Sequence, residues 1–333
     1  MTSDSESGPG EGRTDRAASS ARNATARAST HTLLGPLALL AASALWGGMY
    51  PVMKRALLET QPFTLITLEY LVAVLVLLPV AAPRLRRTPP TILLKALGMG
   101  LLWFGGVSLV FLGLRETSAG LSAFIVIQTA VVTPILVGLS GGGWFDRRLG
   151  GAIVLVLGGM AVIFLLGEEV AFAPATALIA LAVVLLSVHM IVLGKLTHQA
   201  PAPVLVWVQV AVTCGGAAVI SFFAEQWPAV PSGLGPWTRA AILYGGLGSS
   251  LLAVLLQTLG QRITPVTHVG IFLSLESVFA VLLSIALGVE SLEARTALGF
   301  TLVFAGTVLA QTGLRRESAA AAVEEQLELQ APL

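Results

Sequence analysis

Ten long apolar segments run along the chain, and they constrain its fold more than any other feature. Each has about the 20 residues that an α-helix needs to cross the hydrocarbon core of a bilayer. The segments are continuously apolar, whereas the strands of a membrane barrel alternate and are shorter. Backbone groups in lipid must bond within their own segment, so the sequence predicts helices. The predicted spans are 33–55, 61–82, 92–114, 118–140, 149–167, 173–194, 203–224, 238–260, 267–288 and 295–314.

The composition places the chain outside the class of soluble globular proteins. Hydrophobic residues make up 55% of it and charged residues 11%, whereas a soluble domain carries about 25% charge. The net charge of +1 gives no basic surface for nucleic acid, so the expected partners are the lipid bilayer and a small-molecule substrate. The single cysteine, Cys214, and four scattered histidines have no ligand spacing. No metal site and no cofactor are therefore expected.

Lysine and arginine predict how the segments cross the membrane. Residues 1–32 and 315–333 are polar and are expected to form a disordered tail and a second tail. Fourteen of the 19 Lys and Arg residues fall on the side of the amino terminus, and five fall on the other side. The positive-inside rule then places both termini in the cytoplasm of a multi-pass cell-membrane protein. A homodimer is one assembly that the sequence leaves open.

The two halves of the chain resemble each other. The stretch Leu112-Gly-Leu-Arg115 is echoed by Leu259-Gly-Gln-Arg262, and Gln128 falls on Glu276 when the halves are aligned. We therefore expect two repeats, 33–167 and 173–314, with five helices each. An odd number of helices turns the second copy upside down in the membrane, and inverted repeats are typical of carriers that work by alternating access.

Several motifs resemble a known family. The segment from Leu39 to Leu57, with Trp46-Gly-Gly48 and Lys54, resembles the first helix of the EamA domain of the drug/metabolite transporter superfamily. The stretches Leu275-Glu-Ser277 and Leu287-Gly-Val-Glu290, followed by a glycine-spaced final helix, are similar to the family's closing pattern. The resemblance implies a ten-helix carrier built of two EamA repeats, often an exporter of metabolites, amino acids or drugs. Ser277 stands where the family pattern has proline, and Glu69-Tyr70 where it often has arginine.

Polar residues inside the apolar segments are the first candidates for a substrate or proton site. A charge within the bilayer costs roughly 2.5–3.5 kcal/mol, so each needs a reason. Glu276 and Glu69 are candidate titrating or substrate-binding carboxylates, but Glu276 could equally hold helices together through hydrogen bonds, and Glu69 could reach the outer interface. Gln128, His189 and Gln257 are further candidates. Each of these three could instead hydrogen-bond to a neighbouring helix.

The first segment carries aromatic and hinge candidates. Trp46 and Tyr50 are four residues apart and share a helix face, where they could line a cavity for apolar or cationic metabolites or pack as a stripe. Gly47, Gly48 and Pro51 are candidate gating hinges, since Pro51 leaves a backbone carbonyl unbonded. A static kink is the other interpretation.

The expected function is secondary transport of a small metabolite, amino acid or drug-like molecule. We expect an exporter driven by a proton or substrate gradient, because no nucleotide-binding loop is present in the sequence. A receptor or structural membrane protein without transport is the alternative, and a membrane enzyme a weaker one. An enzyme is not expected because no convergent catalytic set is found.

Overall fold

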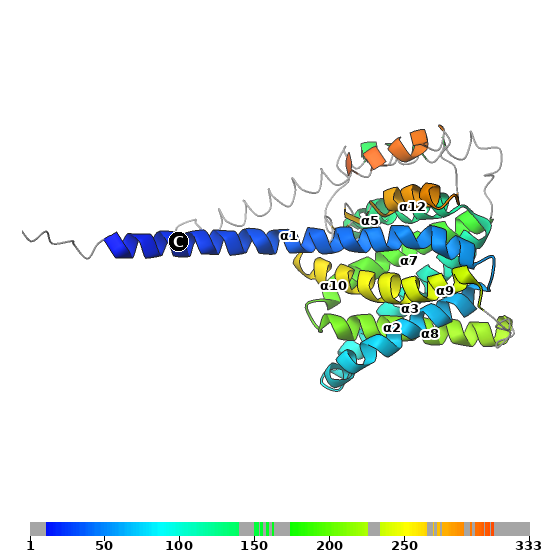
Figure 1. The fold of residues 1–333 in the computed structure, drawn as a ribbon, viewed down its shortest axis with the longest axis horizontal. Coiled ribbons are helices and arrows are strands. Elements are labelled where there is room, and N and C mark those ends of the chain that lie inside the picture. Colours follow the sequence, from blue (N-terminus) through cyan, green and yellow to red (C-terminus); the bar gives the residue numbers. More distant parts are fainter. Residues whose placement is uncertain are drawn as a thin grey trace, which may run out of the picture.

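A computed structural model of the chain describes residues 11–139, 174–225, 234–264 and 275–289, with shorter helical stretches between 150 and 162, 269 and 273, and 294 and 309. Side chains are described from Leu34 onward. All the regular secondary structure in these residues is helical. The elements are α1 (Glu11–Ala56), α2 (Pro62–Leu85), α3 (Pro90–Glu116), α4 (Ala119–Val126), α5 (Thr129–Val137), α7 (Pro174–Leu196), α8 (Ala202–Ala224), α9 (Pro236–Leu243), η2 (Tyr244–Ala253), α10 (Val254–Ile263) and α12 (Leu275–Ala286) (Figure 1).

Seven helical segments in the described residues are long and apolar enough to cross a membrane. They are Leu34–Ala56, Pro62–Leu85, Pro90–Glu116, Ala119–Val137, Pro174–Leu196, Ala202–Ala224 and Pro236–Ile263. Two shorter apolar helices, Leu275–Ala286 and Ala297–Gly306, fall in the ninth and tenth predicted spans. Most of the fifth predicted span, 149–167, lies outside the described residues. The chain is thus an all-helical multi-pass membrane protein, and the count of ten spans stays a prediction.

The first helix is longer than the sequence analysis expects. The α1 helix begins at Glu11 and extends well beyond the helical body in Figure 1. Residues 11–32 are therefore helical in the structure, where we expect a disordered tail. The physical reason lies in the alanines of this stretch, since alanine has the highest intrinsic helix propensity.

Two of the predicted spans are not regular α-helices. The span 118–140 is divided into α4 and α5 by a tight turn at Ile127 and Gln128. The span 238–260 begins as α9, widens into the ten-residue π-helix η2 and continues as α10. π-Helical turns occur frequently at functional sites. Both irregular segments border the cavity described below.

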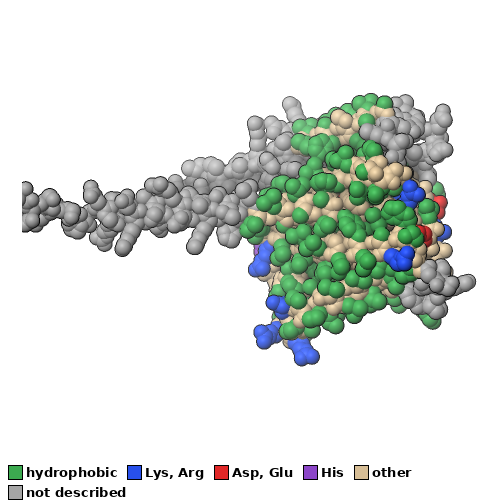
Figure 2. All heavy atoms as spheres, in the orientation of Figure 1, with side chains coloured by type: hydrophobic (Ala, Val, Ile, Leu, Met, Phe, Trp, Pro, Cys, Tyr) green, Lys and Arg blue, Asp and Glu red, His purple; other side chains and the backbone are tan. Residues whose placement is uncertain are grey.

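The outer surface of the bundle has the character expected for contact with lipid. Large apolar side chains such as Leu75, Leu94 and Phe223 are exposed. Figure 2 shows a broad hydrophobic face, with Lys and Arg side chains gathered at the two ends of the helices. Apolar flanks between charged ends fit a body that is embedded in a bilayer.

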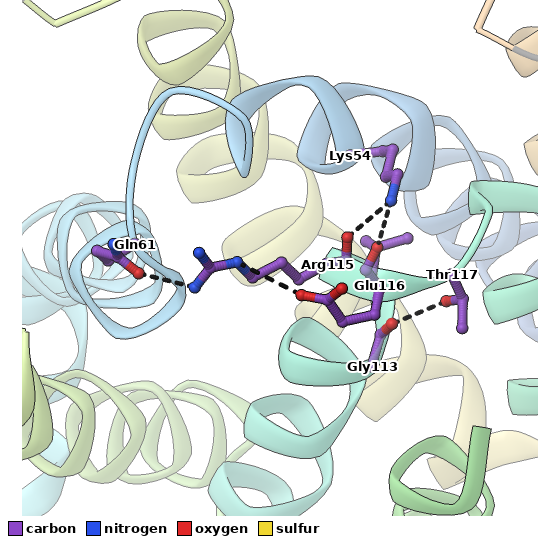
Figure 3. Close-up of polar contacts among 7 residues, drawn as sticks. Lys54, Gln61, Gly113, Arg115, Glu116 and Thr117 are labelled. Carbon is purple, nitrogen blue, oxygen red and sulfur yellow. Dashed lines mark hydrogen bonds and ion pairs between the residues drawn. The ribbon is translucent and has the colours of Figure 1, made fainter. Parts of the chain in front are cut away.

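One end of the bundle, which we call the distal end, contains Lys54, Gln61, Arg115 and Glu225. The Lys54 ammonium donates to the carbonyls of Leu114 at 3.0 Å and Arg115 at 2.8 Å, and so caps the end of α3 (Figure 3). The Arg115 guanidinium donates to the Gln61 amide oxygen at 2.9 Å. These bonds tie the end of α3 to the end of α1 and the start of α2.

Two carboxylates at the distal end cap helices of the opposite half of the chain. Glu225 accepts hydrogen bonds from the amides of Phe63 and Thr64 at the start of α2. Glu59 accepts hydrogen bonds from the Thr238 amide and hydroxyl, both at 2.8 Å, at the start of α9. Burial alone would raise the pKa of Glu59, but the hydrogen bonds from Thr238 outweigh it and lower the pKa below its ordinary value.

The Glu59 cap predicts a pH-dependent contribution to stability. A carboxyl whose pKa is lowered in the folded state stabilises that state above its unfolded pKa, and the benefit is lost as the pH falls through the folded pKa. We expect Glu59→Gln to cost about 1 kcal/mol at neutral pH. The difference from the wild type should shrink on acidification. Thermal unfolding in detergent between pH 7 and pH 3 measures both effects.

Glu116→Gln is the matched control for this prediction. Glu116 forms a 3.8 Å ion pair with Arg115, and its side chain is 70% exposed. Surface ion pairs contribute little to stability, so the melting temperature of Glu116→Gln should match that of the wild type at every pH. A constant difference between Glu59→Gln and the wild type down to pH 3 would contradict the carboxylate cap.

Candidate functional site

A cavity of about 100 Å³ lies in the centre of the helical body. Its walls come from both halves of the chain: α1 to α5 from the first half, and α7, η2, α10 and α12 from the second. Six of the candidate residues from the sequence line it, and they are Trp46, Tyr50, Glu69, His189, Gln257 and Glu276. The helices therefore bring together polar groups that are up to 230 positions apart in the sequence.

Glu69 is the most buried carboxylate of the cavity wall. Its side chain is 2% exposed. One carboxylate oxygen accepts a hydrogen bond from the Ser250 hydroxyl, and the other, Oε2, has no partner within the protein. Gly245 and Gly246 of η2 pack directly against Glu69, where a Cβ atom would collide with it. Gly245 therefore makes the room that this carboxylate occupies, and Gly246 allows η2 to approach the backbone of α2.

Glu276 also lines the cavity, from the first turn of α12. The Tyr50 hydroxyl of α1 hydrogen-bonds to its carboxylate. The backbone of α1 approaches so closely here that a Cβ on Gly47 would collide with the Glu276 carbonyl and the Phe279 side chain. Gly47 thus allows the close contact between α1 and α12 that sets Glu276 beside Tyr50.

Aromatic rings form a continuous cluster along the same cavity. The rings of Trp46 and Trp103 have centroids 6.0 Å apart, and Trp103 and His189 lie 4.9 Å apart. The Trp103 indole N–H donates to the Tyr70 hydroxyl at 3.0 Å, and the Trp46 N–H donates to the Ser249 carbonyl at 3.1 Å. With both N–H groups bonded to protein, the indoles offer their ring surfaces to the cavity.

The amide and imidazole candidates differ in how they are paired. His189 Nε2 lies 2.7 Å from the Gln209 side-chain oxygen, so this histidine hydrogen-bonds to the neighbouring helix α8. Gln257 is 2% exposed, and its side-chain oxygen has no protein partner. Gln128 does not line the described cavity: its amide nitrogen donates to the Phe124 carbonyl of the preceding helix α4 at 3.2 Å.

The hinge candidates lie in an unbroken helix. The α1 helix continues through Gly47, Gly48 and Pro51 to Ala56. Both glycines are sites of close approach, Gly47 to α12 and Gly48 to the Tyr244 hydroxyl of η2. Their absent side chains serve packing in this conformation, and the gating role stays a prediction.

Most of the chain matches a known protein family. The model of the EamA-like transporter family matches the chain twice, over residues 33–165 and 174–312. The chain belongs to the EamA-like transporter family. It is also similar in fold to a protein of known crystal structure, with a TM-score of 0.64 and 22% sequence identity over 86% of this chain and 98% of the other. No curated protein matches the sequence.

The two EamA repeats contact each other through matching glycines. Gly113 of α3 packs against Ile179 and the Ala175 carbonyl, at the start of α7. Gly260 of α10 packs against Leu39 and the Gly35 carbonyl, in the corresponding part of α1. Gly113 and Gly260 belong to the two similar stretches Leu-Gly-x-Arg. Each repeat thus uses the same glycine to approach the first helix of the other.

Several polar residues at the EamA-like cavity were not predicted from the sequence, among them Tyr70 and Ser249, which line it, and Ser250, which bonds to Glu69. Ser249 and Ser250 lie next to each other in the π-helix and bond to Trp46 and Glu69. The adjacent pair of hydroxyl residues within an apolar span was the available signal. Tyr70 directly follows Glu69 in the sequence. Its hydrogen bond with Trp103 depends on how α2 and α3 are placed, which the sequence does not specify.

Proposed function

We propose that this EamA-like protein is a secondary transporter that moves a small molecule across the cell membrane by alternating access. The observation that carries the proposal is the central cavity, because it lies between the two repeats and is lined by Glu69 of one and Glu276 of the other. A site at the seam of two repeats can be exposed to either side when one repeat rocks against the other.

The packing between helices supports an exchange of two equivalent states. The α3 helix packs on α7, and its counterpart, formed by α9, η2 and α10, packs on α1. The α1 helix packs on α12, as α7 packs on α4 and α5. The α2 helix packs on its own counterpart α8. Exchanging the repeats leaves this pattern unchanged, as expected for inverted repeats of five helices each and ten in total.

The charged ends support an orientation with both termini in the cytoplasm. The distal end is then extracellular, and hydrogen bonds that Glu59 accepts from α9 and Glu225 accepts from α2 join the two repeats there. A proton or substrate gradient is the proposed driving force, since two carboxylates at one site can exchange protons with either side. Export is the proposed direction.

Reconstitution tests the proposed function. Purified protein in liposomes should catalyse gradient-dependent uptake or exchange for at least one member of a metabolite and drug panel, and a pH gradient should change the rate. Empty liposomes give the background. Binding without any flux, with or without the gradient, would favour a receptor or structural protein and overturn the transporter assignment.

A further inference from the structure

The chemistry of the cavity selects the charge of its substrate. We infer that the substrate class is organic cations with an apolar or aromatic body, held by the free Oε2 atom of Glu69 and by the Trp46–Trp103–His189 ring cluster. This inference rests on the proposed function, since it describes the cargo of the same cavity. Four observations carry it: the sign of the charged groups, the unpaired carboxylate oxygen, the available ring faces and the paired backbone amides.

The described wall of the cavity carries two carboxylates and neither lysine nor arginine. The nearest cationic side chains by sequence, Lys54 and Arg55, donate to backbone carbonyls at the distal end, and Arg55 lies 5.9 Å over the Trp237 ring. Of the Lys and Arg residues outside the described parts, Arg295 is the first residue of the tenth predicted span, and the others fall in predicted loops and tails. An anionic substrate would therefore meet two carboxyl groups and no fixed cationic partner in the described wall.

Most backbone amides of the turn between α4 and α5 are unavailable as the missing positive partner. This turn is one of the two irregular segments at the cavity. Gln128 donates to the Ile125 carbonyl, Ala130 donates to the Ile127 carbonyl at 2.9 Å, and Val131 and Val132 donate to the Gln128 carbonyl. A zwitterion such as an amino acid would bring a carboxylate for which the described wall has no Lys or Arg partner.

Glu69 is built to bind a group that the protein itself lacks. Ser250 donates to one carboxylate oxygen, Gly245 of η2 leaves room for the side chain, and Oε2 has no hydrogen-bond partner although Glu69 is only 2% exposed. A buried carboxylate oxygen without a partner is costly. An ammonium or quaternary cation in the cavity would supply the missing interaction.

The ring cluster completes the site for a cation with an apolar body. Trp46 and Trp103 have their N–H groups bonded elsewhere, so the substrate meets the electron-rich ring faces. A cation over a desolvated indole gains roughly 2 kcal/mol or more in other proteins. The apolar walls from Met49, Val107 and Phe111 suit the rest of such a molecule.

Ligand binding to the full chain in neutral-lipid nanodiscs tests the inference without any transport assay. The probes are three cations (benzyltrimethylammonium, phenethylamine and tetraphenylphosphonium), the anion phenylacetate and the zwitterion phenylalanine. Calorimetry and intrinsic tryptophan fluorescence report binding. At least one cation should bind to the wild type at least about tenfold more tightly than phenylacetate and phenylalanine. Failure of all three cations, or equal binding of either other probe, overturns the inference.

Variants place the cation within the site. Glu69→Gln should weaken cation binding by about 30-fold, the usual effect of removing one partner of a buried charge pair. Trp103→Phe should weaken it less, and Glu116→Gln, at the exposed end of α3, should leave it unchanged. Unchanged cation affinity in folded Glu69→Gln contradicts the assignment. If Glu69→Gln does not fold, the probe comparison in the wild type still decides.

The outcomes separate the substrate class from the proposed function. Liposome flux of anions or zwitterions without cation binding would leave the transporter assignment standing and remove the cationic cargo. Cation binding that depends on Glu69, with no flux of any probe, would keep the binding site and remove transport.

Discussion

Glu276→Gln is expected to reduce gradient-driven flux to the background of empty liposomes, while the protein still inserts and folds. The carboxylate lines the central cavity and is hydrogen-bonded by Tyr50. Glutamine keeps the size of the side chain and can still accept that hydrogen bond, but it can neither release a proton nor balance a cation. The stability should therefore change by less than about 1 kcal/mol. Flux per folded protein, with melting temperature measured on the same preparation, checks the result.

The same variant separates the two interpretations of Glu276. If the carboxylate only holds α12 against α1, Glu276→Gln will lower the folded yield and melting temperature, and the flux of the surviving folded protein will be near the wild-type rate. If it couples transport to protons, driven flux disappears but substrate exchange at equal pH continues. If it binds substrate, both disappear. Glu116→Gln is the control, because it makes the same chemical change outside the cavity.

The course of the helices could be predicted largely because lipid leaves few alternatives. The predicted span 61–82 corresponds to α2, Pro62–Leu85, and the span 203–224 to α8, Ala202–Ala224. Proline in the first turn marks both starts, where its missing N–H costs nothing. The π-helix η2 could not be predicted, because apolar periodicity does not distinguish it from an α-helix when every face is apolar.

The candidate site was only partly predictable, for a different physical reason. Glu69 and Glu276 are conspicuous because charges are rare within a bilayer. Whether such residues meet depends on how each helix is rotated about its axis, and the sequence does not specify that rotation. Gln128 matches Glu276 in the repeat yet bonds back to Phe124 of α4, whereas Ser250 of the π-helix η2 bonds to Glu69. The packing of the helices therefore decides which polar residues meet in one site.

Gly47→Ala is expected to be the most damaging single-methyl addition on α1. The new Cβ would collide with the backbone carbonyl of Glu276 and with the Cβ of Phe279 on α12. Backbone atoms cannot rotate out of the way, so α1 and α12 must move apart. Overpacking of this kind costs about 1–3 kcal/mol, occasionally more. It should also move Glu276 away from Tyr50. We expect a lower melting temperature and a loss of flux.

The same substitution in α3 provides the control with the opposite expected sign. A Cβ on Gly98 meets no atom within 4 Å. Gly98→Ala should therefore show only the gain in helix propensity, about 0.5–1 kcal/mol, with flux unchanged. Both variants add one methyl group to a glycine inside a helix, so the contact with α12 is what distinguishes them. If Gly47→Ala raised the melting temperature as Gly98→Ala does, α1 and α12 would not be in the close contact that positions Glu276 in the cavity. The placement of this carboxylate between the two repeats, and the transport mechanism that depends on it, would then have to be abandoned.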